Sequence, residues 1–409
     1  MTSTTHDQLP PTGGREPDYI DIYSEAYDND VHDAHRHARE AAWYATTPMG
    51  IMAVRYAEVN SLLKDHRLGE LGGQALLGLG ITEGPLWDWW NLMLFSKDGD
   101  EHLRLRRLIA SAFTPRKVEQ MRPVISDIAN GLVERLKGQD DCEFVSTFAA
   151  PFAIAAIGHL LGSKESDYDE IYRASSDLAL AFTGQIGEQR ERIEGGLAVL
   201  NSYADDLIAE HRRHPAADLV SDLIAVEEGG DRLSESELQM LITILIFGGL
   251  DTTQCQFACA IAVFAEHPDQ WELLAAHPDL APGAAEEILR YEPAGAGAPR
   301  RAVTDFAFEG LDFHEGDVVF PSTMAANRDP RVFKNADAFD ITRPRGATQL
   351  TFGGGFHYCL GAALARAELE EALPILAKRL VGLVPAGPAE WRKLATIRGP
   401  EFLPVSFRR

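Results

Sequence analysis

The sequence has few basic residues and lacks long uninterrupted apolar runs. Its 409 residues include 62 acidic and 38 basic side chains, which gives a formal net charge of -24. A field of this sign repels phosphate backbones and anionic lipids, so it argues against nucleic-acid binding. No window reaches the roughly 18 consecutive apolar residues of a membrane span. The longest apolar stretch, 238–264, is broken by Thr243, two glycines and Asp251, and it predicts a buried helix.

Cysteine is also scarce. The four cysteines are Cys142, Cys255, Cys259 and Cys359. No CxxC pair or Cys/His cluster has the spacing of a zinc site. Cys255 and Cys259 lie one helical turn apart in an apolar run, and we interpret them as small buried hydrophobic residues.

The N-terminal residues are polar and lack the charged start and apolar core of a signal peptide. We expect a mobile lead over 1–20 and a single domain over 21–409, located in the cytoplasm. The segment from Gly78 to Gly84 only approaches a dinucleotide-binding fingerprint, because its spacing is wrong and no strand precedes it. Without a flavin, nicotinamide or iron–sulfur module, a redox reaction would need electrons from a separate protein.

Helical periodicity dominates from about residue 100 to 380 and predicts a mainly α fold with small peripheral β-sheets. The expected helices are 102–113, 116–136, 148–161, 166–182, 188–211, 219–226, 235–265, 268–276, 284–291 and 360–380. A short strand at 51–54 precedes a helical pattern through Leu63, and further strands are expected within 299–320 and after Val381. Residues 66–98 are rich in glycine and tryptophan without a sustained period, and predict a long loop.

The segment 351–361 is the most informative part of the chain. Three consecutive glycines from Gly353 allow a tight turn that brings backbone close to a flat ligand. Cys359 then opens a helix, where free amide groups and the helix dipole favour a thiolate and would tune the potential of a bound iron. Two alternatives are a nucleophilic cysteine, with His357 as the nearest base, and an inert turn.

The pattern Phe352-x-Gly-x-Phe-His357-x-Cys359-x-Gly361 resembles the haem-binding signature of the cytochrome P450 family. The resemblance covers essentially residues 40–409, with four motifs in the expected order. It implies the P450 fold, in which haem b (iron protoporphyrin IX) lies between the long central helix and the cysteine loop. It also implies that Cys359 is the iron ligand and that Phe352 and Gly361 contact the haem.

The long helix expected from Glu235 to about Ala265 has a well-defined start. Ser234 and Glu237 form a capping box, and Leu233 can pack on Leu238 as a hydrophobic staple.

Two adjacent glycines, Gly248 and Gly249, lie in the middle of this helix, where each costs up to ~1 kcal/mol. Room for a ligand, with a local break in the helical hydrogen bonds, would explain them. The run 248–253 is similar to the oxygen-binding groove of the family, which implies that Thr252 hydrogen-bonds dioxygen and that Asp251 delivers protons. The alternative is a structural kink with a solvated Asp251. An intact acid–alcohol pair argues against a peroxide-driven relative.

Glu287 and Arg290 place opposite charges three residues apart on one helix face, a pattern that usually marks a solvated surface. In the family the matching pair is buried and is completed by a second arginine, for which Arg343 is the candidate. The implied role of these three residues is structural.

Haem propionates need cations or hydrogen-bond donors. His102 and Arg106, one helical turn apart, resemble the propionate-binding helix of the family. Arg300 and His357 are the other two candidates, with Arg301 as an alternative to Arg300 by one register. Surface ion pairing is the competing interpretation for each of them.

Five basic residues and no acidic residue lie between His102 and Lys117, namely Arg104, Arg106, Arg107, Arg116 and Lys117. In an acidic chain this patch suits an acidic ferredoxin, docked on the face of the cysteine ligand. Candidates for the substrate pocket are Trp87, Trp89, Phe182, Phe247 and Ala296. The small residues around Ala296 leave space, so we expect a bulky or polycyclic apolar substrate.

The resemblance implies a monooxygenase that inserts one oxygen atom from O2 into a C–H bond. A haem-thiolate isomerase or dehydratase is an alternative that would not need Asp251 and Thr252. A non-catalytic haem carrier or gas sensor is an alternative of another class, and a cysteine hydrolase would be colourless when purified.

Overall fold

The computed structural model describes residues 16–408 except 111–112, 184–185, 228–232 and 394–395. Helix accounts for 58% of the structure and the sheets are small, which confirms the predicted fold class. The α-helices are α1 (Glu25–Asn29), α2 (Val31–Ala41), α3 (Tyr56–Leu62), α4 (Gln74–Leu77), α5 (Pro85–Leu92), α6 (Gly99–Ala110), α7 (Pro115–Arg135), α8 (Ala150–Leu161), α9 (Tyr168–Ala179), α10 (Ile186–Arg213), α11 (Leu219–Glu227), α12 (Glu235–Glu266), α13 (Pro268–Ala276), α14 (Ala281–Tyr291), α15 (Thr323–Ala326) and α16 (Ala362–Arg379).

Short 3₁₀ or π segments link several of these helices: η1 (Leu94–Ser96), η2 (Val145–Ala149), η3 (Glu165–Asp167), η4 (Leu180–Phe182), η5 (Pro278–Leu280) and η6 (Gly355–His357). The strands are β1 (Tyr44–Thr47), β2 (Gly50–Ala53), β3 (Leu68–Glu70), β4 (Asp141–Glu143), β5 (Arg300–Ala302), β6 (Phe306–Phe308), β7 (Leu311–Phe313), β8 (Val318–Pro321), β9 (Val381–Pro385), β10 (Glu390–Trp391), β11 (Pro400–Phe402) and β12 (Pro404–Arg408).

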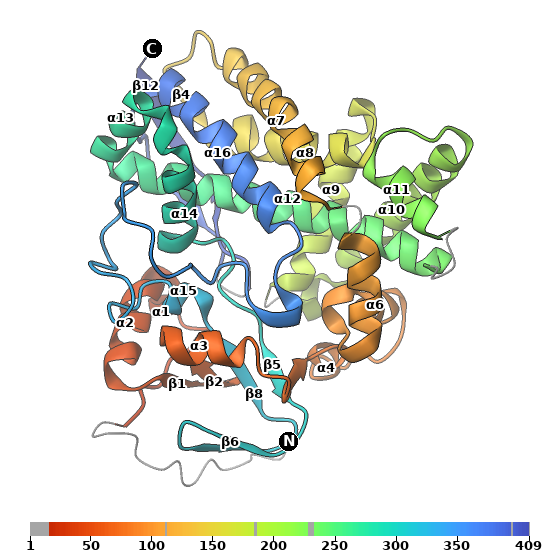
Figure 1. The fold of residues 1–409 in the computed structure, drawn as a ribbon, viewed down its shortest axis with the longest axis vertical. Helices are drawn as coiled ribbons and strands as arrows, with labels where there is room; N and C mark the ends of the chain where they lie inside the picture. Colours follow the sequence, from red (N-terminus) through yellow and green to blue (C-terminus); the bar gives the residue numbers. More distant parts are fainter. Residues whose placement is uncertain (1–15, 111–112, 184–185, 228–232, 394–395, 409) are drawn as a thin grey trace.

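Helix α12 runs through the middle of the helical part, while α7 and α16 lie side by side above it (Figure 1). The predicted capping box starts α12, because the Ser234 hydroxyl accepts a hydrogen bond from the Glu237 amide at 3.2 Å and the Glu237 carboxylate accepts one from the Ser234 amide at 2.7 Å. The helix is long and apolar enough to cross a membrane, but 72% of its apolar window is buried inside the fold. Packing against α8, α9 and α10 therefore accounts for its composition.

Among the described residues the strands form four sheets. The largest has the order β1-β2-β8-β5-β3 and lies with α1, α2 and α3 in the lower part of Figure 1. Strand β2 runs parallel to β8, and the other pairs in this sheet are antiparallel. A second sheet, β4-β12-β9, pairs the C-terminal strand with residues 141–143 far back in the chain. The remaining sheets are the hairpins β6-β7 and β10-β11.

The local structure differs from the prediction in two places. Residues 66–98 are not one loop, because β3, α4, α5 and η1 lie within them. Helices α1 and α2 were not predicted. Most of the predicted mobile lead lies outside the described residues, and Ile20 at its end is buried and donates a backbone hydrogen bond to Thr46 at 2.9 Å.

The glycine pair in α12 agrees only in part with the predicted explanation, room for a ligand with a break in the helix. The helix continues without interruption through Gly248 and Gly249, so the expected break is absent. A Cβ atom on Gly249 would lie 2.7 Å from the Ile157 side chain, which shows that close packing of α8 on α12 needs a glycine here. A Cβ atom on Gly248 would meet nothing within 4 Å, because this residue faces open space.

A buried carboxylate, Glu292, connects distant parts of the chain. His32 lies 2.7 Å from it, Arg398 3.0 Å and Arg328 3.5 Å. Burial alone would raise the pKa of Glu292, but these three neighbours lower it to about 2. The ion cluster thus joins α2, the end of α14, the segment after α15 and the C-terminal segment.

Candidate functional site

The loop before α16 is shaped by its glycines. Gly353 and Gly355 have φ angles of 71° and 62°, in the left-handed region that favours glycine. A Cβ atom on Gly355 would also lie 2.8 Å from the Leu63 carbonyl oxygen. The Cys359 amide donates to the Phe352 carbonyl at 2.8 Å and closes the loop. These constraints fix the cysteine just before the first turn of α16.

The Cys359 side chain is accessible although neighbouring protein encloses it, as expected for a thiol at the wall of an internal space. Removal from bulk water raises the pKa of this thiol, and the amides of Gly361 and Ala362 together with Arg106 and Arg366 only partly offset that effect. The amides at the helix start thus favour a thiolate, as expected, but burial outweighs their effect. A metal cation would supply the missing stabilisation. A raised pKa also argues against the nucleophilic-cysteine alternative.

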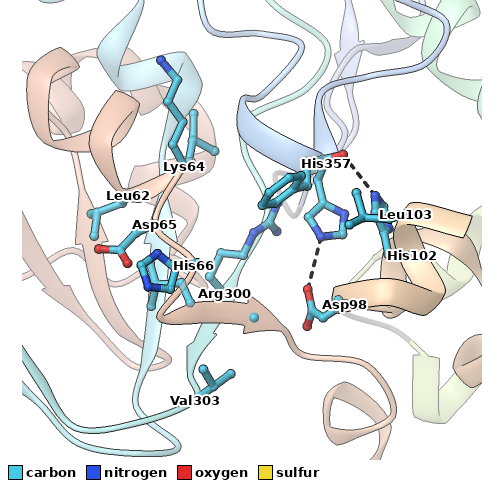
Figure 2. A pocket seen from close by; sticks show the side chains of 15 residues that line it. Leu62, Lys64, Asp65, His66, Asp98, His102, Leu103, Arg300, Val303 and His357 are labelled. Carbon is cyan, nitrogen blue, oxygen red and sulfur yellow. Dashed lines mark hydrogen bonds and ion pairs between the residues drawn. The ribbon is translucent and has the colours of Figure 1, made fainter. Parts of the chain in front are cut away.

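Three of the four predicted propionate ligands meet at one cavity of about 220 Å³. His102 comes from α6, Arg300 from β5 and His357 from the cysteine loop, and Figure 2 shows their side chains converging. The two histidine rings lie 4.1 Å apart between centroids. His102 is held on both sides, because its ring nitrogens lie 3.0 Å from the carbonyl oxygens of Leu94 and Phe356.

Two acidic residues that were not predicted meet these donors. Arg300 contacts Glu70 at 3.0 Å, and His357 lies 3.3 Å from Asp98 (Figure 2). Burial raises the pKa of Glu70 to about 7, although Arg300 opposes the shift. Arg300 and His357 thus bind carboxylates in this structure. The two haem propionates are carboxylates as well.

The other basic candidates are placed differently. Arg106 donates to the Tyr358 carbonyl at 2.6 Å and is not among the residues that line the cavity. In β5, Arg300 is buried while Arg301 is only partly buried, and successive side chains of a strand point to opposite faces. The register therefore selects Arg300 over Arg301 for the cavity.

Both members of the predicted acid–alcohol pair have partners. The Thr252 hydroxyl donates to the Gly248 carbonyl at 2.5 Å. The Asp251 carboxylate is buried and receives both terminal nitrogens of Arg392, at 2.9 and 3.0 Å. Asp251 is consequently not the solvated residue of the kink interpretation. Arg392 was missed because it lies 141 residues away in the sequence.

The exposure of residues on α12 and in the cysteine loop shows whether a haem can fit between them. Gly248 is exposed and Thr252 half-buried, although most of the surrounding residues of α12 are buried. Cys359, in the loop before α16, is also exposed. An accessible thiol, an open glycine and a nearby set of carboxylate-binding cations together fit a haem with its two propionates.

The predicted structural residues form a compact cluster. Arg290 donates two hydrogen bonds to Glu287, both at 2.8 Å, and Arg343 adds a third at 2.8 Å. Arg290 is 2% exposed and also donates to the carbonyls of Asn327 and Ala336. The pair is thus buried, contrary to the surface interpretation, and it fastens the segment before the cysteine loop to α14.

The predicted pocket residues are only partly brought together. Phe182 stacks on Phe247 with ring centroids 4.4 Å apart and an interplanar angle of 17°. Trp90, not Trp87 or Trp89, also stacks on Phe182, with ring centroids 5.3 Å apart. Trp89 is buried beside Trp90, and Trp87 is half-buried.

Ala296 does not belong to this aromatic group. Its side chain packs in a separate apolar cluster with Met324 and residues of α2, while its amide donates to Thr396 at 3.0 Å. The neighbouring Gly295 and Ala298 are half-buried. Ala296 therefore lies apart from the aromatic group of Phe182 and Phe247.

The predicted basic patch is smaller than the sequence indicates. Arg104 forms an ion pair with Glu237, and Lys117 forms one with Asp222, so distant acids neutralise two of its members. Arg107 and Arg116 are exposed. Phe356 is 61% exposed and Leu103 43%, and both also line the cavity of His102 and His357.

Fold and site define a mainly helical protein built to hold a haem beside a cysteine. The family model for Cytochrome P450 matches residues 88–275 and 280–380. Luteothin monooxygenase of Streptomyces thioluteus is 39% identical over 374 residues, which cover 90% of this chain and 91% of the relative. Nocardicin C N-oxygenase of Nocardia uniformis subsp. tsuyamanensis is 38% identical and covers 77% of this chain and 79% of its own. The crystal structure of CalO2 has a TM-score of 0.90 at 28% identity, over 95% of this chain and 99% of that one.

The chain belongs to the cytochrome P450 family. It is a haem-b-dependent P450 monooxygenase, which uses O2, a small-molecule substrate and electrons from a redox partner.

Proposed function

We propose that Cys359 ligates the haem iron and that the enzyme oxidises a bulky apolar molecule with electrons from a ferredoxin-type donor. The observation that carries this proposal is the accessible Cys359 thiol in an enclosed position, with the amides of Gly361 and Ala362 directed at its sulfur. When bound, the haem supplies reductive activation of dioxygen, by which one oxygen atom enters a C–H bond.

The residues at the cavity would bind the propionates. His102, Arg300 and His357 converge there with carboxylates already beside them, which supports this role. Arg106 lies near the cysteine and lowers the pKa of its thiol, so it would stabilise the thiolate as well. Phe352, whose carbonyl holds the Cys359 amide, and Gly361, which leaves the sulfur uncovered, would border the haem.

Thr252 and Asp251 would donate protons on the substrate side of the haem. The Thr252 hydroxyl is half-buried at the open face of α12, where it can exchange its bond to the Gly248 carbonyl for one to a ligand. Asp251 is adjacent and ionisable, so it can resupply the proton that Thr252 donates. Glu287, Arg290 and Arg343 would have a structural role, holding the segment before the cysteine loop.

The aromatic group of Trp90, Phe182 and Phe247, with Trp89 packed behind it, would exclude water and contact an apolar substrate. Trp87, which is half-buried, remains a candidate for substrate contact at the edge of this aromatic group. A ferredoxin-type partner would dock near Phe356, with Arg107 and Arg116 providing positive charge. We place the enzyme in the cytoplasm, not in a membrane, and treat residues 21–409 as one domain.

The test compares two cysteines. Cys359→Ala should abolish the shifted Soret band of the reduced, carbon-monoxide-bound protein and all hydroxylation. Cys142→Ala, the same substitution at a half-buried cysteine, should leave both unchanged. A Cys359→Ala protein that retains the shifted band and turnover would overturn the assignment.

A further inference from the structure

Glu70, in β3, is a carboxylate that pairs with Arg300 at the cavity. The two residues are Cα partners in the antiparallel pair of β3 and β5, so their side chains lie on the same face of the sheet. The terminal nitrogens of Arg300 lie 3.1 and 3.0 Å from the two carboxylate oxygens of Glu70. Both side chains are 9% exposed. The ion pair is therefore bidentate and largely shielded from solvent.

The same carboxylate also reaches the cysteine loop. His357 Nε2 lies 3.3 Å from Asp98 (Figure 2) and 3.4 Å from Glu70. Asp98 accepts a hydrogen bond from the Glu70 amide at 2.8 Å, and a Cβ atom on Gly69 would lie 2.7 Å from the Asp98 carboxylate. Close packing thus holds two carboxylates against two of the donors of the cavity.

The groups that face the Glu70 carboxylate are Arg300, Asp98 and His357. Burial lowers the pKa of His357, so this ring is neutral at ordinary pH and Arg300 is the cation beside Glu70. Burial also raises the pKa of Glu70 to about 7, a shift that Arg300 opposes and the charge of Asp98 reinforces. The ionised and the neutral form of Glu70 are therefore both populated near neutral pH.

A bound haem would bring two further carboxylates to these donors. An ionised Glu70 and a propionate would compete for the guanidinium of Arg300, and like charges at one site disfavour the ionised form of each. We propose that Glu70 is a positioning residue for Arg300, holding its guanidinium when ionised and leaving it free for a haem propionate when protonated. This role rests on the proposed binding of the propionates at this cavity.

Haem binding then requires that Glu70 take up a proton from solvent. Haem is held most firmly where the carboxyl group of Glu70 is neutral, which is the acid side of its pKa. Retention weakens as pH rises through that pKa, because the carboxylate then reclaims Arg300 and repels the propionate.

The first experiment measures haem loss from the ferric holoenzyme to excess apomyoglobin, followed by the Soret absorbance. Glu70→Gln keeps the shape of the side chain without its charge. The wild type should lose haem as slowly as Glu70→Gln at about pH 6 and about tenfold faster at about pH 8.5, since one unit of pKa shift corresponds to a tenfold change in affinity. Titration of other groups, Cys359 included, affects both proteins alike. A ratio of the two rates that is the same at every pH would overturn the proposal.

Glu134→Gln is the matched control, because it makes the same substitution in a half-exposed pair with Arg379. It should lose haem at the wild-type rate throughout, and a Glu70→Gln protein that behaves in the same way would also overturn the proposal.

Asp98→Asn provides a second test that leaves Glu70 in place. Removing this like charge lowers the pKa of Glu70, so haem loss should begin to accelerate at a lower pH than in the wild type. An unchanged onset would contradict the proposed role, including in the case that Glu70→Gln fails to take up haem.

Arg300→Ala separates this inference from the proposed function. If Arg300→Ala loses haem no faster than the wild type, the propionates do not bind at this cavity, and that part of the proposed function is wrong. If it loses haem faster while the wild type and Glu70→Gln keep a constant ratio of rates, the role of Glu70 alone is wrong.

Discussion

The carboxyl group of Glu368 accepts a 3.2 Å hydrogen bond from the Thr253 hydroxyl, deep between α16 and α12. Burial raises the pKa of Glu368 to about 8, and the bond from Thr253 offsets only part of the shift. A neutral glutamic acid therefore bonds the residue next to Thr252, and the glutamate side chain must take up a proton when the protein folds.

This requirement predicts a pH-dependent stability. The ordinary pKa of the group is 4.5 and its folded value about 8, so stability is lost as pH rises between these values. Glu368→Gln should remove this dependence and stabilise the protein by up to about 4 kcal/mol at alkaline pH. Denaturant unfolding of both proteins from about pH 5 to about pH 9 measures it. Parallel curves for the two proteins would contradict the assignment.

Glu292 predicts the opposite dependence. Its folded pKa of about 2 lies below the ordinary value of 4.5, so its contribution is present above the ordinary value and is lost as pH falls toward 2. Glu292→Gln should cost about 3–5 kcal/mol near neutral pH, because buried arginines lose their counter-charge. Glu134→Gln, at a half-exposed pair, should cost under about 1 kcal/mol. Equal losses in the two variants would refute this view of the cluster.

The aromatic stack predicts a change in substrate size. Phe247→Ala removes a ring that lies 4.4 Å from Phe182, and the space left should favour larger ligands. Spin-state titration with apolar molecules of increasing size should show an optimum displaced upward, at a stability cost of about 3 kcal/mol. Phe313→Ala disrupts a comparable stack with Phe306 in the hairpin β6-β7 and should leave the optimum unchanged. An unchanged optimum in Phe247→Ala would exclude this ring from the pocket.

Partner docking is tested by charge reversal at the exposed members of the basic patch. Arg107→Glu and Arg116→Glu should each slow reduction by an acidic iron–sulfur ferredoxin, by about tenfold at low ionic strength and less in high salt. Arg379→Glu, on the surface of α16, controls for net charge. Stopped-flow reduction that is equally fast in all variants would place the docking face elsewhere.

Local sequence signals predicted the long helices well. The helix α13 has the predicted limits, and the capping box set the start of α12 correctly, because both depend on neighbouring residues. Helices α4 and α5 were missed because they are short and follow glycines, so neither contains enough turns to show a period.

Long-range partners account for most of the remaining errors at the site. Glu237 neutralises Arg104 and Asp222 neutralises Lys117. Both acids lie on other helices, more than 100 residues along the chain, so the sequence around the patch does not reveal them. Asp251 was singled out from its motif, but its partner Arg392 comes from the segment between β10 and β11. The motif thus indicates candidate residues for the chemistry, while the charges beside them depend on tertiary packing.

The Glu292 cluster and the pairing of β12 with β4 have a consequence for biosynthesis. Both join residues early in the chain to residues that are made much later, namely Arg398 and β12, so neither can form before those residues have left the ribosome. A nascent chain would therefore expose an unfinished helical core until β12 has emerged. We expect prosthetic-group capture to be late for the same reason, and a truncation that removes β12 should leave an apoprotein prone to aggregation.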